Sequence, residues 1–100
     1  MIELCGITDI PDGECRMFQV CDSHIAICNV GGTLHAIDNI CPHRGAFLGQ
    51  GTLNGSILTC PWHEWKFDVT SGKGITNPLA AVRRHKIVVE NDTVLLAADD

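Results

Sequence analysis

Two short loops that each carry one cysteine and one histidine constrain this chain more than any other feature. The first is Cys41-Pro42-His43-Arg44-Gly45, and the second is Cys60-Pro61-Trp62-His63, with 16 residues between His43 and Cys60. Thiolates and imidazoles are ligands for zinc and for iron–sulfur centres. If all four side chains bind one metal centre, the fold has to bring the two loops side by side.

The mixed pairing within each loop favours a binuclear iron centre. In a [2Fe–2S] centre with two Cys and two His ligands, one iron takes both cysteines and the other takes both histidines. A loop that straddles the core can place its Cys on one iron and its His on the other, and two such loops clamp the core from opposite sides. Two thiolates leave the oxidised core neutral, whereas four would leave it doubly negative, so the mixed set accepts an electron more readily. The ligand pattern therefore predicts an electron carrier.

Two other interpretations of the loops stay open. A structural zinc module also uses two Cys and two His, but it usually pairs like with like, as C-x2-C followed by H-x3-H. Nucleophilic catalysis by one Cys with a nearby His needs a thiol of low pKa and a third, orienting group. That second interpretation leaves the other loop without a role.

The two loops resemble those of soluble Rieske-type ferredoxins and of the Rieske domains of multicomponent oxygenase systems. The resemblance covers nearly the whole chain and extends to Trp65-Lys66-Phe67-Asp68 and Thr70-Ser71-Gly72. It implies one [2Fe–2S] cluster per chain and a third, proline-containing loop over the cluster, which Asn77-Pro78-Leu79 resembles. It also implies a ligand set in which the cysteines bind the buried iron and the histidines bind the outer iron near the surface: Cys41, His43, Cys60 and His63.

Departures from the respiratory members of this family narrow the expectation. Those members carry a disulfide between the two loops, and the corresponding positions here hold Ala46 and Trp62. They also present hydroxyl donors after the second His, where this chain has Trp65 and Phe67 and no Tyr anywhere. Fewer hydrogen bonds to the cluster sulfurs predict a potential toward the low end of the Rieske range. Glu64 stands where the common motif has Gly, and a glycine there indicates a position with positive φ. The Glu64 carboxylate is either a solvated surface charge or a docking contact.

The resemblance implies a carrier in a multicomponent system and not an enzyme in its own right. A flavin-containing, NAD(P)H-dependent reductase loads the cluster, and a terminal oxygenase that hydroxylates an aromatic or related substrate unloads it, as in aromatic hydrocarbon catabolism. The chain is too short for the mononuclear iron domain of a catalytic oxygenase subunit. The alternative within redox chemistry is the small Rieske subunit of an assimilatory nitrite reductase.

Composition agrees with a small soluble carrier. The chain has 100 residues, 45% of them hydrophobic, and a formal net charge of −5. We expect one domain over 1–100, with a cluster-binding subdomain at about 40–70. The charge argues against nucleic acid as a partner and favours transient docking to basic protein surfaces. Met1-Ile2-Glu3-Leu4 is not the start of a signal peptide, and no apolar run is long enough to cross a membrane, so we expect a cytoplasmic protein.

The remaining cysteines and histidines fit no further motif. Cys5, Cys15, Cys21 and Cys28 are expected to act as small hydrophobic residues, with a second metal site or a redox-active pair as the alternatives. His24, His35 and His85 are expected to be ordinary surface or hydrogen-bonded histidines. Arg83-Arg84 is a short basic spot, either a solvated strand face or a docking site.

Short apolar segments between turn dipeptides predict an all-β fold. The expected architecture is a Rieske-like antiparallel β-sandwich or barrel base, built from both ends of the chain, with the small cluster-binding subdomain at its tip. Asn54-Gly55 is the strongest hairpin signal and suggests a type I′ turn that brings the two loops to one end. A helical turn is expected at Ala46 to Leu48. The expected strands are Met17 to Val20, His24 to Val30, Thr33 to Ile37, Ser56 to Thr59, Val82 to Glu90 and Thr93 to Ala97.

Overall fold

A computed structural model of the protein contains three antiparallel sheets. The structure describes residues 2–20, 22–40, 47–61, 64–77 and 79–97. A central sheet, in the order β2-β3-β4-β8, consists of Cys15–Val20, Ser23–Val30, Thr33–Asp38 and Arg84–His85. A terminal sheet, β1-β10-β9, consists of Ile2–Gly6, Thr93–Leu96 and Ile87–Glu90. The third sheet, β5-β6-β7, consists of Thr52–Asn54, Ile57–Thr59 and Lys66–Asp68.

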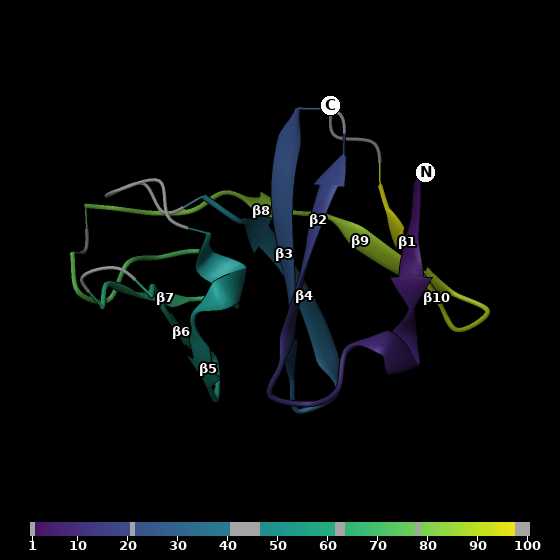
Figure 1. The fold of residues 1–100 in the computed structure, drawn as a ribbon, viewed down its shortest axis with the longest axis horizontal. Helices are drawn as coiled ribbons and strands as arrows, with labels where there is room; N and C mark the ends of the chain where they lie inside the picture. The colour runs from purple at the N-terminus through teal and green to yellow at the C-terminus, as the bar shows by residue number, and fades with distance from the viewer. Residues whose placement is uncertain (1, 21, 41–46, 62–63, 78, 98–100) are drawn as a thin grey trace.

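The central sheet lies between the other two along the long axis of the molecule (Figure 1). The β5-β6-β7 sheet lies at one end, and the terminal sheet lies at the other, where β1 and β10 join the two ends of the chain with Ile2 opposite Leu96. The expected all-β fold, with a base built from both ends of the chain, is confirmed. No described segment is an α-helix; the only helical elements among the described residues are two 3₁₀ turns, Ile7–Asp9 and Leu48–Gln50.

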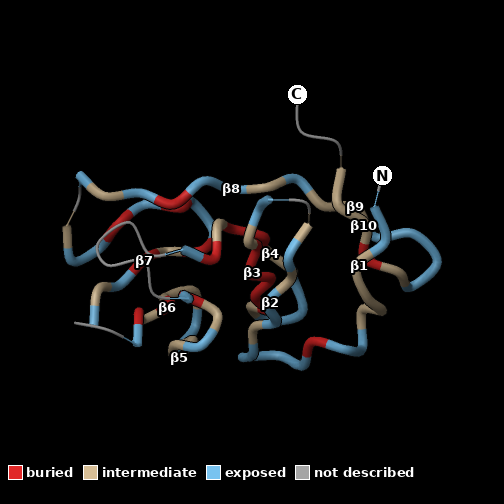
Figure 2. The backbone as a smooth tube through the Cα atoms, turned by 45° about the horizontal axis from the view of Figure 1, so that its top comes forward, coloured by how far each residue is buried: buried red, intermediate tan, exposed pale blue. Residues whose placement is uncertain are grey.

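Strand β3 is buried on both faces, and its alternation supplies two cores. Ala26 and Cys28 pack in a core cluster with Phe67 of the third sheet. Ile25 and Ile27 belong to a second cluster, which contains Val94 of the terminal sheet. Because side chains alternate between the faces of a strand, this one strand connects both ends of the molecule. Figure 2 shows this concentration of buried positions in the central sheet.

The structure corrects several details of the sequence prediction. The segment Val82 to Glu90 is not one strand, because β8 pairs with β4 whereas β9 pairs with β10 in a different sheet. The helical turn expected at Ala46 to Leu48 is a 3₁₀ turn from Leu48 to Gln50; Ala46 itself lies outside the described residues. The strands β1, β5 and β7 were not among those predicted.

The Asn54-Gly55 hairpin exists, but its turn type differs from the prediction. Asn54 pairs with Ile57, so the two central residues are Gly55 and Ser56. Only Gly55 has positive φ, at 62°, which is the type II′ pattern and not type I′. Two-residue turns with positive φ at both centres occur at Gly31-Gly32, between β3 and β4, and at Asn91-Asp92, between β9 and β10.

Gly51 is the position where the fold depends most on the absence of a side chain. It follows the 3₁₀ turn, and its amide donates a hydrogen bond to the carbonyl of Leu48 at 2.9 Å. A Cβ at this position would clash with the backbone carbonyl oxygen of Thr59 in β6. Backbone atoms in a sheet cannot move aside as a flexible side chain can.

We predict that Gly51→Ala destabilises the fold by about 2 kcal/mol, since the methyl group overpacks a rigid site. Urea unfolding followed by circular dichroism measures this. Gly6→Ala is the matched control, because Gly6 has the same φ of −81° and its added Cβ would meet nothing closer than 3.4 Å. We expect the control to change stability by less than about 1 kcal/mol; equal losses in both variants would contradict the prediction.

Candidate functional site

The ends of the first cysteine–histidine loop are held together by buried Asn39. Its backbone amide donates to the carbonyl of His24 at 2.8 Å, and its own carbonyl accepts from the amide of Leu48 at 2.7 Å. Its side-chain oxygen accepts from the amide of Gly49 at 2.7 Å. The next residue, Ile40, forms an isolated antiparallel bridge with Phe47. The strand before the loop and the turn after it are thereby fixed at one point.

The second loop is closed by a backbone hydrogen bond at its base. The amide of Cys60 donates to the carbonyl of Trp65 at 2.6 Å, and the preceding residue, Thr59, pairs with Lys66 in the β6–β7 ladder. The side chain of Cys60 belongs to the core cluster, and only 1% of the residue is exposed. The cysteine at the start of this loop therefore faces the interior.

Glu64 has a positive φ of 55°, as the glycine of the common motif suggested. This left-handed conformation costs a residue with a Cβ roughly 1–2 kcal/mol relative to glycine. Glu64 is exposed, so its carboxylate adds negative charge to the surface of the second loop. The structure supports both the positive φ and the surface charge.

A third loop is pinned against the strand that leaves the second loop. The amide of Ile75 donates to the carbonyl of Lys66 at 2.8 Å, and the amide of Lys66 donates to Thr76 Oγ1 at 3.0 Å. Asn77 turns the chain, because its side-chain oxygen accepts from the amide of Leu79 at 3.0 Å. Leu79 is 95% exposed, which is unusual for a leucine.

Only one of the four predicted ligands, Cys60, lies within the described part of the chain; Cys41, His43 and His63 lie outside it, as do Trp62 and Pro78. Among the described residues, no three or more His, Cys, Asp or Glu side chains are grouped to hold a metal ion. The described residues nevertheless fit a cluster held between two loops, because both loops have fixed ends and the Cys60 side chain is shielded from water. Two thiolates and two imidazoles are also the donor set that a Rieske centre needs.

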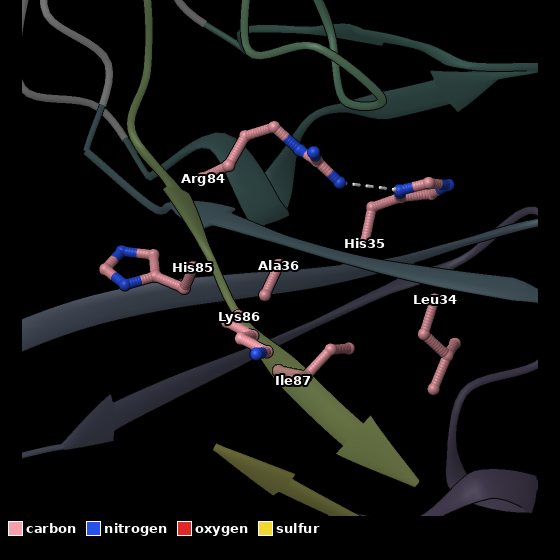
Figure 3. Close-up of a pocket in the computed structure, with 7 residues that line it drawn as sticks. All are labelled: Leu34, His35, Ala36, Arg84, His85, Lys86 and Ile87. Carbon is pink, nitrogen blue, oxygen red and sulfur yellow. Dashed lines mark hydrogen bonds between the residues drawn. The ribbon is translucent and has the colours of Figure 1, made fainter. Parts of the chain in front are cut away.

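The other histidines have the ordinary partners that were expected. Arg84 donates to Nδ1 of His35 at 3.3 Å, and Nε2 of His85 lies 2.6 Å from Oδ1 of Asp38. Burial and, secondarily, the Arg84 charge lower the pKa of His35. Both histidines line a surface pocket of about 360 Å³, but their rings point away from each other (Figure 3). The ring of His24 contacts that of Phe47, with centroids 5.5 Å apart.

Comparison with known proteins agrees with a centre that two cysteines and two histidines hold. The family model of the Rieske [2Fe-2S] domain matches residues 1–93 of this chain. The ferredoxin component of the naphthalene 1,2-dioxygenase/salicylate 5-hydroxylase systems of Ralstonia sp. is 34% identical over 95% of this chain and 92% of that protein. The ferredoxin component of the alkene monooxygenase system of Xanthobacter autotrophicus is 32% identical over 98% of this chain and 81% of that protein.

A solved structure shows the same fold. It is a complex of reduced oxygenase and oxidized ferredoxin in carbazole 1,9a-dioxygenase, in which the matched chain superposes with a TM-score of 0.89 and 28% identity. The match covers 96% of this chain and 100% of that one. The resemblance seen in the loops is thus confirmed over nearly the whole chain, and the cofactor it implies is a [2Fe–2S] cluster and not zinc. This chain belongs to the Rieske [2Fe–2S] domain family.

Proposed function

We propose that this protein is the ferredoxin component of a multicomponent oxygenase system, carrying one electron at a time from a flavin-containing, NAD(P)H-dependent reductase to a terminal oxygenase. The observation that carries the proposal is that the two relatives above, at 34% and 32% identity over nearly the whole chain, are both ferredoxin components of oxygenase systems. Such a component transfers electrons and is not itself the enzyme. The same relatives favour this role over that of a nitrite reductase subunit.

We propose Cys41, His43, Cys60 and His63 as the cluster ligands. The bound cluster supplies a centre that takes up and releases a single electron. The buried Cys60 side chain supports an inward-facing cysteine end, and the loop-closing bonds at Asn39 and Cys60 support loops whose ends stay fixed when the charge of the cluster changes. A rigid ligand frame keeps the reorganisation that accompanies electron transfer small.

The proposed location is the cytoplasm, where the reductase would find its NAD(P)H. None of the helices in the described part of the chain is long and apolar enough to span a membrane. The formal charge of −5 favours encounters with basic patches on the partners, and such steering weakens as salt is added.

We predict that the purified protein contains about two irons per chain and gives a rhombic electron paramagnetic resonance signal on reduction. Cys60→Ala should abolish the signal and most of the iron, because it removes a thiolate ligand. Cys5→Ala is the matched control, because Cys5 is half-buried in β1 of the terminal sheet, away from the two loops. The Cys5→Ala protein should keep its cluster. A Cys60→Ala protein that retains the signal would contradict the ligand assignment.

Electron delivery is tested with a reductase and a terminal oxygenase of a naphthalene dioxygenase-type system. With NADH and reductase, the visible absorbance of the cluster should bleach, and addition of the oxygenase with its substrate should restore it. The rate of bleaching should fall as ionic strength rises, because screening weakens charge steering. The proposed role would be contradicted if dithionite bleaches the intact cluster but none of the tested reductases does.

Glu64 allows the backbone and the charge of the second loop to be separated. Glu64→Gly should raise the free energy of unfolding by up to about 1 kcal/mol, because it relieves the left-handed conformation at some cost in chain entropy. Glu64→Gln keeps the conformation and removes only the charge, so stability should hardly change. Urea unfolding of both variants measures this, and a Glu64→Gly protein less stable than the wild type would show that the positive φ carries no strain. If the Gln variant alone alters the rate of reduction by the reductase, the carboxylate contributes to docking.

A further inference from the structure

Two cysteines outside the cluster loops face each other across the central sheet. The register of β2 and β3 places Cys15 directly opposite Cys28. The amide of Asn29 donates to the carbonyl of Glu14 at 2.9 Å, so Glu14 and Asn29 form a hydrogen-bonded pair and the next pair, Cys15 and Cys28, is non-hydrogen-bonded. Such pairs have the closer Cα separation, about 4.5 Å, at the short end of the range of about 4.4–6.8 Å that a disulfide spans.

The two thiols lie on the same side of the sheet, because Cys28 belongs to the core cluster and Cys15 packs against that cluster. The neighbouring thiol is the largest influence on the pKa of each group. It lowers the pKa of Cys15, because an adjacent S–H donor favours a thiolate there, and it raises the pKa of Cys28, which is also fully buried. Of the two thiols, Cys15 is therefore the one that loses its proton more easily, and Cys28 is the one that retains it.

Cys15 lines a surface pocket, whereas Cys28 is fully buried. The pocket has a volume of about 310 Å³, and its wall continues through Glu14, Gly49 and Gly51 to Leu53. Arg16, the residue after Cys15, also lowers the pKa of the thiol through its charge. A small polar oxidant can enter such a pocket and meet Cys15 first, with Cys28 behind it in the core.

We propose that Cys15 and Cys28 form a site of reversible disulfide formation, in which Cys15 reacts with a hydroperoxide and Cys28 completes the bond. The Cys15 thiolate attacks the peroxide, an S–O bond forms as the O–O bond breaks, and the leaving hydroxide or alkoxide takes up a proton. The Cys28 sulfur then attacks Cys15, the S–S bond forms as the S–O bond breaks, and the Cys28 proton leaves with the hydroxide as water. In total, two thiols lose two electrons and the peroxide gains them.

The rest of the chain contains a natural control for this chemistry. Cys5 is also half-buried in a strand, but its cross-strand partner is Val94, and burial together with Asp9 raises its pKa. Cys5 therefore has no thiol opposite it, and its pKa is shifted in the direction opposite to that of Cys15. A general sensitivity of cysteines to peroxide would modify both residues, whereas the proposed site modifies only the pair.

The test treats the cluster-loaded protein with equimolar hydrogen peroxide, blocks remaining thiols with an alkylating agent, and maps the peptides by mass spectrometry. We expect a Cys15–Cys28 linked peptide that has lost two hydrogen atoms, unmodified Cys5, and unchanged cluster absorbance. Dithiothreitol should reverse the link. In Cys28→Ala we expect a sulfenic acid at Cys15 that dimedone traps, because the second step is blocked.

Several results would overturn the proposal. The first is that the peroxide is consumed but Cys15 and Cys28 can still be alkylated. The second is that the cluster is lost before any link forms. A link from Cys15 to a cluster-loop cysteine would also exclude the pair. The linked peptide is measured in the unaltered chain, so the conclusion does not depend on whether a variant folds, and Cys15→Ser adds an independent check because it should yield neither link nor adduct.

Discussion

The closure of two loops at fixed points is the constraint on which the rest of this structure depends. A cluster that takes two ligands from each of two loops forms more readily when the loop ends are already close, since ordering free chain at the site costs roughly 1–2 kcal/mol per residue. Buried Asn39 fixes the first loop through three hydrogen bonds, and the Cys60–Trp65 bond fixes the second. The β5–β6 hairpin of the third sheet leads from the end of the first loop to the start of the second.

The backbone accommodates this closure at two unusual positions. Gly51 allows the turn after the first loop to lie directly on β6, which no residue with a Cβ could do at that distance. Glu64 has a left-handed conformation beside the second loop, in a place where the chain gains a surface carboxylate and accepts local strain. Strain of this kind persists only where the surroundings fix the backbone, and the Cys60–Trp65 bond supplies that fixation.

The sequence predicted the strands that have a clear local pattern of apolar residues between turns. It did not predict β1, β5 and β7, whose extent depends on the strand that each pairs with. The β2–β3–β4 meander was recognisable because apolar and β-branched residues lie between clear turn dipeptides. The segment Val82 to Glu90 looked continuous, but its halves pair in different sheets, which no local pattern encodes. β7 contains only three residues, so its pairing with β6 depends on the loop that joins them. The four ligands were predicted from residue type and spacing, whereas the anchoring role of Asn39 had no sequence signal, because an asparagine after a strand usually marks a turn.

One core connects the cluster end of the molecule with the cysteine pair of the central sheet. Cys28 and Cys60 belong to the same buried cluster, together with Phe67 and Val69. Cross-strand Cβ atoms lie about 4.5–5.5 Å apart, and a disulfide draws them to about 3.8 Å, so bond formation at Cys15 tightens the β2–β3 pair. Interiors packed at crystal density transmit such a shift to neighbouring side chains. Oxidation of the pair would therefore alter the packing around Cys60 through this shared core while the cluster stays bound.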